Sequence, residues 1–196
     1  MKNNDYLLPG LAAIAVAILS PLYWMIELGS ISSSFPNSLT VKELGVSNIL
    51  FLVVGILSIV VYSGLIKILH DHFNNKKLDI ALISMMVWCV IFYGGTFFLD
   101  ALSAYYDGEL SVVFIQWLWI GGMIVFGVLD VLIAVLILKD SQELSSLLKS
   151  FAIVNLVMGF FELTVIFSIA AIFIFPVVFV ILAVGFFRKP EMVEIV

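Results

Sequence analysis

Residues 151–187 read FAIVNLVMGFFELTVIFSIAAIFIFPVVFVILAVGFF, and the number of membrane spans depends on how this run folds. It contains no Lys or Arg and only one carboxylate, Glu162. As a single helix it would extend about 55 Å at about 1.5 Å per residue, far beyond the roughly 30 Å hydrocarbon core of a bilayer. We therefore predict two helices, over residues 141–167 and 169–187, joined by a tight outer turn near Ser168. A single span followed by a re-entrant segment is the alternative.

Composition places the rest of the chain in the same class. Of 196 residues, 63% are hydrophobic and 12% are charged, and the mean hydropathy is +1.23. A soluble chain of this size could not bury so much apolar surface. Four further apolar runs are long enough to span a bilayer, at residues 7–28, 48–69, 78–99 and 112–138, and a long outer loop is expected at 29–47. The sequence thus predicts an all-α, polytopic transmembrane bundle of six helices, forming one integral membrane domain over residues 1–196.

The basic residues test the number of spans independently. With six spans, eight of the nine Lys and Arg residues fall on one side of the membrane and only Lys42 falls on the other. With five spans the split is six against three. Because basic loops tend to stay in the cytoplasm, this distribution favours six spans with both termini cytoplasmic. We expect the inner (plasma) membrane of a bacterial or archaeal cell.

Several classes of function are disfavoured by what the sequence lacks. The net charge of -5 and the pI near 4.8 argue against nucleic acid as a partner, because phosphate binding needs a basic face. The single cysteine, Cys89, lies in an apolar run and supports neither a disulfide nor a thiolate metal cluster. We find no zinc helix, Walker loop, dinucleotide-binding glycine motif or serine elbow. The sequence therefore predicts no cofactor and no catalytic or metal-ligating residues, and it favours a protein that is not an enzyme.

Polar and small residues recur at helical spacing on five of the six predicted helices, so each of the five carries one polar stripe. Polar side chains are costly in lipid, so we expect the stripes to face a common centre and to line a polar cavity open to the outer side. The last helix has no such stripe, and we expect it to be peripheral or to contact another subunit. The candidate residues for binding a ligand or ion are Glu162, Asp130, Glu27, Asp100, Tyr23, Tyr93, Thr96 and Gln116.

Glu162 and Asp130 stand out because they lie inside predicted spans. No intramembrane Lys or Arg is available as a partner, which favours a protonated acid or a bound cation over a buried salt bridge. One interpretation is that the two residues bind a cation or move a proton, with Glu162 as the central carboxylate and Asp130 as an inner relay. The other is that both are protonated and join helices through hydrogen bonds.

His70, Asp71 and His72 end the second predicted helix at its cytoplasmic face. Histidines two positions apart point in different directions on a helix, and no further His exists to complete a metal site. We expect these residues to form, with nearby lysines, a cap that contacts anionic headgroups. Four aromatic residues near the outer boundary are predicted to be interfacial anchors, namely Tyr23, Trp24, Trp117 and Trp119.

The overall plan also supports a comparison with known membrane proteins. A long outer loop follows the first predicted helix, the second ends with YSGLIKIL at residues 62–69, and the last contains the segment from Pro176 to Phe187 with its late Gly185. In these features the chain resembles the small six-helix bacterial integral membrane proteins of unknown function. This resemblance implies no activity.

Three functions remain open from the sequence. The first is a small transporter or binding protein whose cavity takes a cation, a proton or a small cationic solute. The second is a structural or accessory protein that supports a membrane complex or an envelope response, which predicts tightly packed polar stripes without a cavity. The third is a lipid-modifying enzyme that uses His70 and Asp71 at the inner headgroup level. The lipid bilayer is a partner in all three, and an oligomeric partner could contact the last helix.

Overall fold

Six helices long and apolar enough to cross a membrane make up the computed structural model, which describes residues 5–34, 44–73, 76–105, 109–139, 145–164 and 167–188. The first two spans are α1 (Leu7–Ser34) and α2 (Val46–Phe73). The third span is continuous and consists of α3 (Asp79–Cys89), the π-helical segment η1 (Val90–Gly94) and α4 (Gly95–Tyr105). The last three spans are α5 (Glu109–Lys139), α6 (Ser146–Leu163) and α7 (Ser168–Phe187). The described ranges contain no strand, so the predicted six-helix, all-α fold is confirmed.

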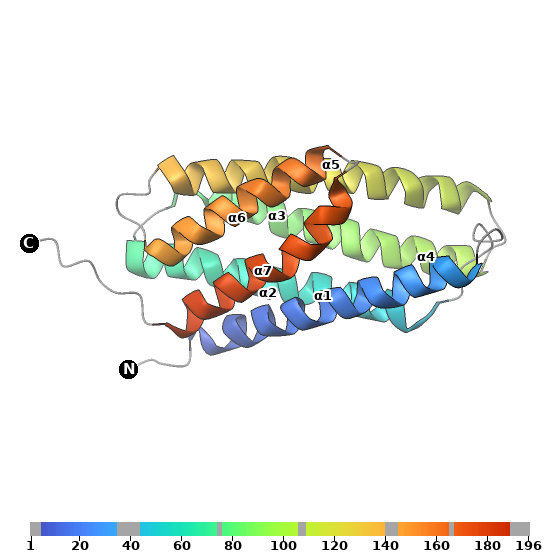
Figure 1. Ribbon diagram of the computed structural model, residues 1–196, viewed down its shortest axis with the longest axis horizontal. Helices are drawn as coiled ribbons and strands as arrows, with labels where there is room; N and C mark the ends of the chain where they lie inside the picture. Colours follow the sequence, from blue (N-terminus) through green and yellow to red (C-terminus); the bar gives the residue numbers. More distant parts are fainter. Residues whose placement is uncertain are drawn as a thin grey trace, which may run out of the picture.

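The six spans form a closed ring in which each helix packs against the next. α1 contacts α2, the third span lies between α2 and α5, α5 contacts α6, and α7 lies between α6 and α1. α1 begins and α7 ends at the same end of the bundle (Figure 1). The last helix is thus part of the ring rather than peripheral to it, since Val178 and Phe179 of α7 are fully buried. Phe173 on its outer face is 72% exposed, and a contact of this helix with another subunit stays a prediction. A polar stripe is not needed for an interior position, because small and apolar side chains also pack well between helices in a membrane.

The run at residues 151–187 folds as two helices, and its turn lies between Leu163 and Ser168, close to the predicted position. With 18 and 20 residues, α6 and α7 are about 27 and 30 Å long at about 1.5 Å per residue. α1 and α5, with 28 and 31 residues, reach about 42 and 46 Å. The hairpin of α6 and α7 therefore stops short of the end that α1 and α5 reach, which is called the far end below (Figure 1).

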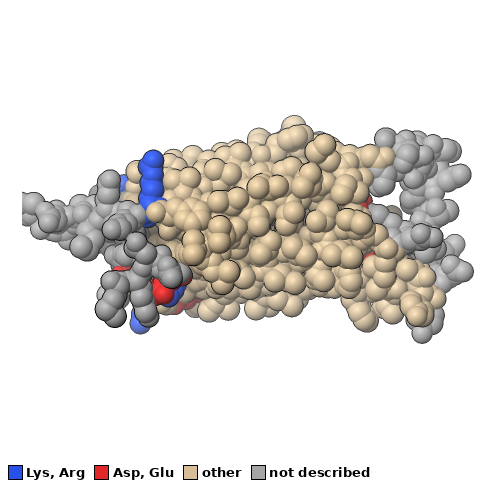
Figure 2. Space-filling model, turned by 90° about the horizontal axis from the view of Figure 1, so that it is seen from below, with Lys and Arg blue, Asp and Glu red and all other residues tan. Residues whose placement is uncertain are grey.

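The described Lys and Arg side chains gather at the opposite end, where α1 begins and α7 ends. Figure 2 shows charged atoms at the two ends of the molecule and none on the face between them. Large apolar side chains point outward along the bundle, among them Ile80, which is 80% exposed, and Phe173, which is 72% exposed. Such a surface suits a lipid environment and would be an aggregation hazard in water. The end that carries Lys67, Lys76, Lys77, Lys139, Lys149 and Arg188 is called the basic end, and the positive-inside rule predicts that it is cytoplasmic.

Helix bounds differ from the predicted ones mainly where the chain turns polar. α1 continues to Ser34, although the sequence predicted a loop from residue 29; residues 35–43 of that loop lie outside the described part of the chain. α6 begins at Ser146, and residues 140–144, where its predicted start falls, are also outside that part. The Ser145 side chain caps α6 by accepting a hydrogen bond from the backbone nitrogen of Leu148 at 3.4 Å, which satisfies one of the free N–H groups of the first turn.

Candidate functional site

Two carboxyl side chains meet between α5 and α6 inside the bundle. Asp130 of α5 is only 2% exposed, and Glu162 lies at the end of α6. Side chains tilt toward the N-terminus of their own helix, so on these antiparallel helices Asp130 leans toward the far end and Glu162 toward the basic end. The two carboxyl groups thus approach each other closely enough for a side-chain hydrogen bond. Such a bond would require a proton on one of the two groups, because an ionised carboxylate only accepts.

A pair of glycines brings the two helices close enough for this contact. Gly127 lies one turn before Asp130, and Gly159 lies one turn before Glu162. A Cβ atom on Gly127 would lie 2.8 Å from the backbone oxygen of Gly159 and 2.9 Å from Leu163 Cγ, closer than side-chain atoms pack. The absence of side chains at these positions therefore permits direct backbone contact between α5 and α6.

Asn155 of α6 holds Asp130 in place. Its Nδ2 atom donates to the backbone oxygen and to Oδ1 of Asp130, both at 3.1 Å. The Oδ1 atom of Asn155 and the Oε2 atom of Glu162 are buried and have no hydrogen-bond partner among the described residues. Buried acceptors without a donor cost free energy, so these two oxygens would be stabilised by a ligand that donates hydrogen bonds or carries positive charge.

The carboxyl pair opens on a cavity of about 100 Å³, called the carboxyl cavity below, and all six spans contribute to its wall. Hydroxyl groups from Ser20, Ser58 and Tyr62 face it together with apolar and aromatic side chains. The Oγ atom of Ser20 is buried there and has no partner within the described ranges. None of the described Lys, Arg or His residues lines this cavity, so no basic side chain neutralises the carboxyl pair.

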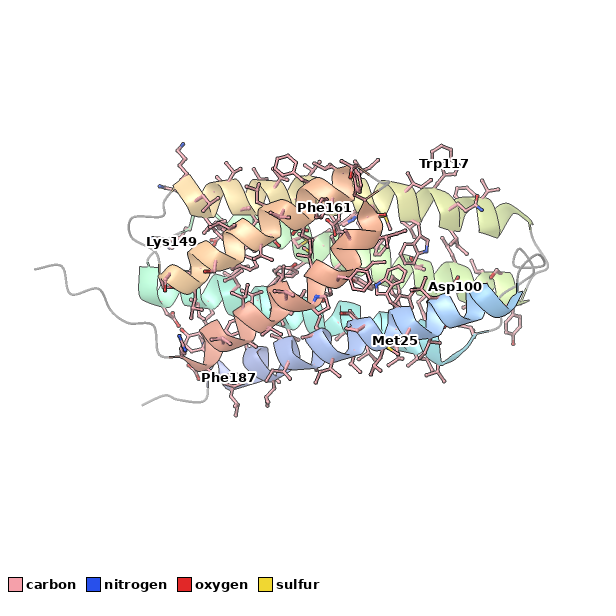
Figure 3. All side chains as sticks on the ribbon, in the orientation of Figure 1. Met25, Asp100, Trp117, Lys149, Phe161 and Phe187 are labelled. Atoms are coloured by element: carbon pink, nitrogen blue, oxygen red, sulfur yellow. The ribbon has the colours of Figure 1, made fainter. Side chains whose placement is uncertain are left out.

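A second cavity, of about 250 Å³, lies on the far-end side of the carboxyl cavity and is called the acidic vestibule. Glu27 of α1 and Asp100 of α4 supply its carboxyl groups. Asn48 of α2 donates from Nδ2 to Asp100 Oδ2 at 2.6 Å, which fixes that carboxyl group across the helix interface. The Thr96 side chain also lines the vestibule, and its hydroxyl is buried without a partner in the described part of the structure. In Figure 3, Asp100 lies toward the far end and Lys149 marks the basic end.

Aromatic rings separate the two cavities. Tyr23, Trp24, Phe51 and Trp119 line both of them and are called the aromatic layer. The ring centroid of Phe51 lies 5.0 Å from that of Tyr23 and 5.4 Å from that of Trp119. The centroids of Trp24 and Trp119 are 5.9 Å apart with an edge-on orientation. These separations are within the range where aromatic rings attract one another, so the layer is a packed unit rather than a set of isolated side chains.

The prediction of interfacial anchors is therefore wrong for three of its four residues. Tyr23, Trp24 and Trp119 belong to the aromatic layer, whereas Trp117 is 68% exposed and points away from the bundle (Figure 3). Distance from the predicted membrane boundary does not distinguish an anchor from an interior ring. The inward rings make aromatic contacts inside the bundle that the sequence pattern did not reveal.

The π-helical segment η1 supplies two further rings. Successive residues of an α-helix point about 100° apart, but the wider π turn lets adjacent Phe92 and Tyr93 both be buried in the bundle. Glycines on the neighbouring helices leave room for them, because a Cβ atom on Gly122 would overlap Phe92 and one on Gly55 would overlap Tyr93. Single π turns inside α-helices occur frequently at functional sites, and this one is placed at the wall of the carboxyl cavity.

The structure brings seven of the eight predicted site residues to these two cavities and leaves out Gln116. Gln116 is exposed on α5 and lines neither cavity. Gln116 lies about 34 Å along α5 from Lys139, the residue at which α5 ends at the basic end. The shorter α6 and α7 also extend from the basic end but do not reach this far. The residues that line a cavity as predicted are Asp130, Glu162, Tyr23 and Tyr93 for the carboxyl cavity, with Glu27, Asp100 and Thr96 for the vestibule.

His70 and Asp71 take part in contacts between helices at the basic end. The His70 Nε2 and Asp79 Oδ1 atoms are 2.7 Å apart, which links α2 to α3. Tyr6, just before α1, donates from its hydroxyl to Asp71 Oδ2 at 2.8 Å. Burial and the hydrogen bond to Asp71 raise the pKa of the Tyr6 hydroxyl above its usual value. The side chain of His72 lies outside the described part of the structure.

Several residues of the site are not among the predicted binding residues. Asn155 lies on a predicted polar stripe and its role as donor to Asp130 follows only from the pairing of α5 with α6. Phe51 lies three residues after Asn48 and four before Gly55, hence on the polar stripe of α2, but a search for polar side chains does not detect an aromatic ring. An aromatic residue on a polar stripe is thus a signal that could have located the aromatic layer.

The geometry of the site is the basis for assigning a function, because comparisons with other proteins add none. No protein-family model, curated protein or solved structure matches the chain. The chemistry available follows from charge. A carboxyl pair that opens on a cavity and has no basic side chain beside it among the described residues can hold either a proton or a cation.

Proposed function

We propose that the protein binds a small monovalent cation at Asp130 and Glu162 in exchange for a proton, and that it carries the cation across the membrane. The observation that supports this is the carboxyl pair of buried Asp130 and part-buried Glu162, which lies on a cavity without a basic residue among the described ones. Six apolar spans provide the setting of a multi-pass membrane protein. Under this proposal the chain resides in the inner (plasma) membrane with its basic end in the cytoplasm.

When the second carboxyl group of the Asp130–Glu162 pair ionises, the negative charge that it adds must be neutralised. Leaving a carboxylate uncompensated inside a membrane bundle costs several kcal/mol, by an amount that depends on local water. A proton or a cation can each remove that cost, but one carboxylate needs only one of them. Binding of a cation to Glu162 and Asp130 therefore displaces the shared proton, and protonation releases the cation. This competition is the basis of coupling between the two ions.

The acidic vestibule supports a route from the far end. Glu27 and Asp100 place carboxyl groups in the larger cavity, and the carboxyl cavity begins on the other side of the aromatic layer. A cation would be concentrated by negative charge before it meets the rings. The described basic residues lie beyond the pair, at the opposite end, so charge changes from acidic to basic along this route.

The two other functions fit the geometry less well. A purely structural role predicts polar stripes that pack without space between them, whereas these stripes line two cavities. A lipid-modifying role at the headgroup level needs His70 and Asp71 to face a substrate. Both side chains are engaged with neighbouring helices, His70 with Asp79 and Asp71 with Tyr6.

The proposal is tested by cation-induced proton release from the purified protein. Protein in detergent at low buffer strength, with a pH indicator, is titrated with alkali and small ammonium salts, and uptake is then measured in proteoliposomes. We expect proton release by the wild type and its loss in Glu162→Gln, because a neutral amide has no proton to exchange. Asp71→Asn removes a carboxyl group outside both cavities and should release protons as the wild type does.

Elution as a monodisperse species establishes that each variant is folded. If folded Glu162→Gln still releases protons on addition of the cation, the pair is not the exchange site and the proposal is wrong. Asp130→Asn is a second test of the exchange site, since it removes the partner carboxyl group and leaves Glu162 in place.

A further inference from the structure

We infer that the transported cation is a small methylated ammonium ion rather than an inorganic cation. This inference rests on the proposed function, since it names the class of cation for the same carboxyl pair. It is carried by the size of the carboxyl cavity and by the aromatic character of its wall.

The size of the cavity limits the ligand. Its volume is about 100 Å³. An engineered protein cavity of about 150 Å³ holds benzene, which has six carbon atoms, so this cavity has room for an ion of about four or five non-hydrogen atoms. Trimethylammonium and tetramethylammonium are of this size. Ions with butyl groups are too large unless the cavity expands.

Aromatic side chains make up much of the wall. Phe51 lies at the centre of a cluster in which its ring centroid is 4.5 Å from that of Tyr93 and 5.6 Å from that of Phe92. The Trp119 ring extends the cluster, at 5.2 Å from Phe92. Aromatic faces attract cations, and cages of such rings bind ammonium ions whose methyl groups fit against them. Glu162 and Asp130 would neutralise the charge, while the rings contact the methyl groups.

A divalent metal ion would find no cluster of carboxylates here. Hard cations such as Ca²⁺ take six to eight oxygen ligands at short distance. Within the described ranges, no group of three or more His, Cys, Asp or Glu side chains is placed to hold a metal ion. Beyond the carboxyl pair, the hydroxyls that line the cavity come one or two at a time from four of the six spans, namely from Ser20, Tyr23, Ser58, Tyr62, Tyr93 and Ser168. A methylated ammonium is weakly hydrated and does not need a full oxygen shell.

The aromatic layer also favours a methylated ammonium over an inorganic ion on the route to the carboxyl pair. A cation that moves from the acidic vestibule must pass between Tyr23, Phe51 and Trp119, which line both cavities. For a strongly hydrated ion these rings are a barrier, because they cannot replace its water. For a methylated ammonium they are binding surface. Selection in the layer and binding at the pair therefore favour the same ligand class.

The experiment compares ammonium with its mono-, di-, tri- and tetramethyl derivatives, and with Na⁺ and K⁺. Binding to the full-length wild type at neutral pH is followed by intrinsic tryptophan fluorescence and by proton release. We expect affinity to rise with methylation, by at least about tenfold from ammonium to tetramethylammonium, and tetrabutylammonium not to compete. Affinity that falls with methylation, or Na⁺ or K⁺ binding as tightly as tetramethylammonium, overturns the inference but leaves cation exchange intact. If no cation releases a proton, the proposed function itself fails.

Two tryptophans on α5 provide a matched pair of variants. Trp119→Leu removes a ring that lines both cavities, while Trp117→Leu makes the same change at an exposed position two residues away. We expect Trp119→Leu to lower affinity for tetramethylammonium about tenfold with little effect on ammonium, and Trp117→Leu to change neither. Phe51→Leu should reproduce the selective loss. If both layer variants fold and weaken all cations equally, or weaken none, the rings do not select the ligand.

Discussion

The glycine contact between α5 and α6 allows a prediction whose size can be worked from distances. A Cβ atom on Gly127 would lie 2.8 Å from the backbone oxygen of Gly159, whereas ordinary Cβ contacts begin near 3.4 Å. A backbone oxygen cannot rotate away, so Gly127→Ala must move the helices apart by about half an ångström. Overpacking of this kind costs about 1–3 kcal/mol, and the better helix propensity of Ala offsets up to about 1 kcal/mol. We expect a net loss of about 1–2 kcal/mol in the free energy of unfolding.

The same separation should weaken the site, since Asp130 and Glu162 each follow one of these glycines by one turn. The assay is an equilibrium unfolding titration from mild detergent into sodium dodecyl sulfate, followed by circular dichroism, with cation-induced proton release measured on the same preparations. Gly121→Ala is the matched control on α5, because a Cβ atom there meets nothing within 4 Å. If Gly127→Ala is as stable as Gly121→Ala and releases protons normally, the close contact does not position the pair.

Two further predictions concern hydrogen bonds. Asn155→Leu removes the donor of both hydrogen bonds to Asp130 and should lower the free energy of unfolding by about 1–3 kcal/mol in the same titration; stability equal to the wild type would show that these bonds are dispensable. Burial and the hydrogen bond to Asp71 raise the pKa of Tyr6, so the folded state keeps this proton longer than the unfolded state does. The contribution of protonated Tyr6 to the free energy of unfolding should be present below about pH 10 and be lost at higher pH. The Tyr6→Phe variant should lack this part of the loss of stability in alkali. Identical alkaline unfolding curves for the two proteins would contradict this prediction.

The number of spans could be predicted because it depends on quantities that the sequence contains directly. The run after Phe151 is too long for one crossing, and the basic residues sort to one side only when it crosses twice. Helix ends were harder to place. Backbone hydrogen bonding continues through Gly29 to Ser34 because a helix does not need to stop where side chains become polar. Polarity marks where lipid ends, and the helix can extend beyond it.

The polar stripes located the carboxyl residues but not the full wall of the site. On α5, Gln116 and Asp130 are 14 residues apart, and at about 100° per residue they differ by about 40° in direction. Gln116 also lies past the end of the α6–α7 hairpin, where no helix of that pair covers it. The π turn at Val90–Gly94 shifts the phase of the third span in the middle, and a search with one fixed period cannot detect such a shift. Which helix covers Gln116 and where the third span changes its period both depend on how the helices pack together. A single sequence does not show this packing.

The unequal lengths of the helices give the proposed route its direction. Because α6 and α7 end early, the carboxyl pair lies near the end of their hairpin, and the longer α1 and the α4 part of the third span extend beyond it to form the acidic vestibule. Under the proposed function, a cation entering there would meet carboxyl groups first, then the aromatic rings, and then the carboxyl pair, from which it would displace a proton. Beyond the pair, toward the basic end, side chains such as Leu82, Ile133 and Ile137 are fully buried. Under the same proposal, release on that side would require the helices at the basic end to separate, and this separation would break the contacts of Tyr6 with Asp71 and of His70 with Asp79.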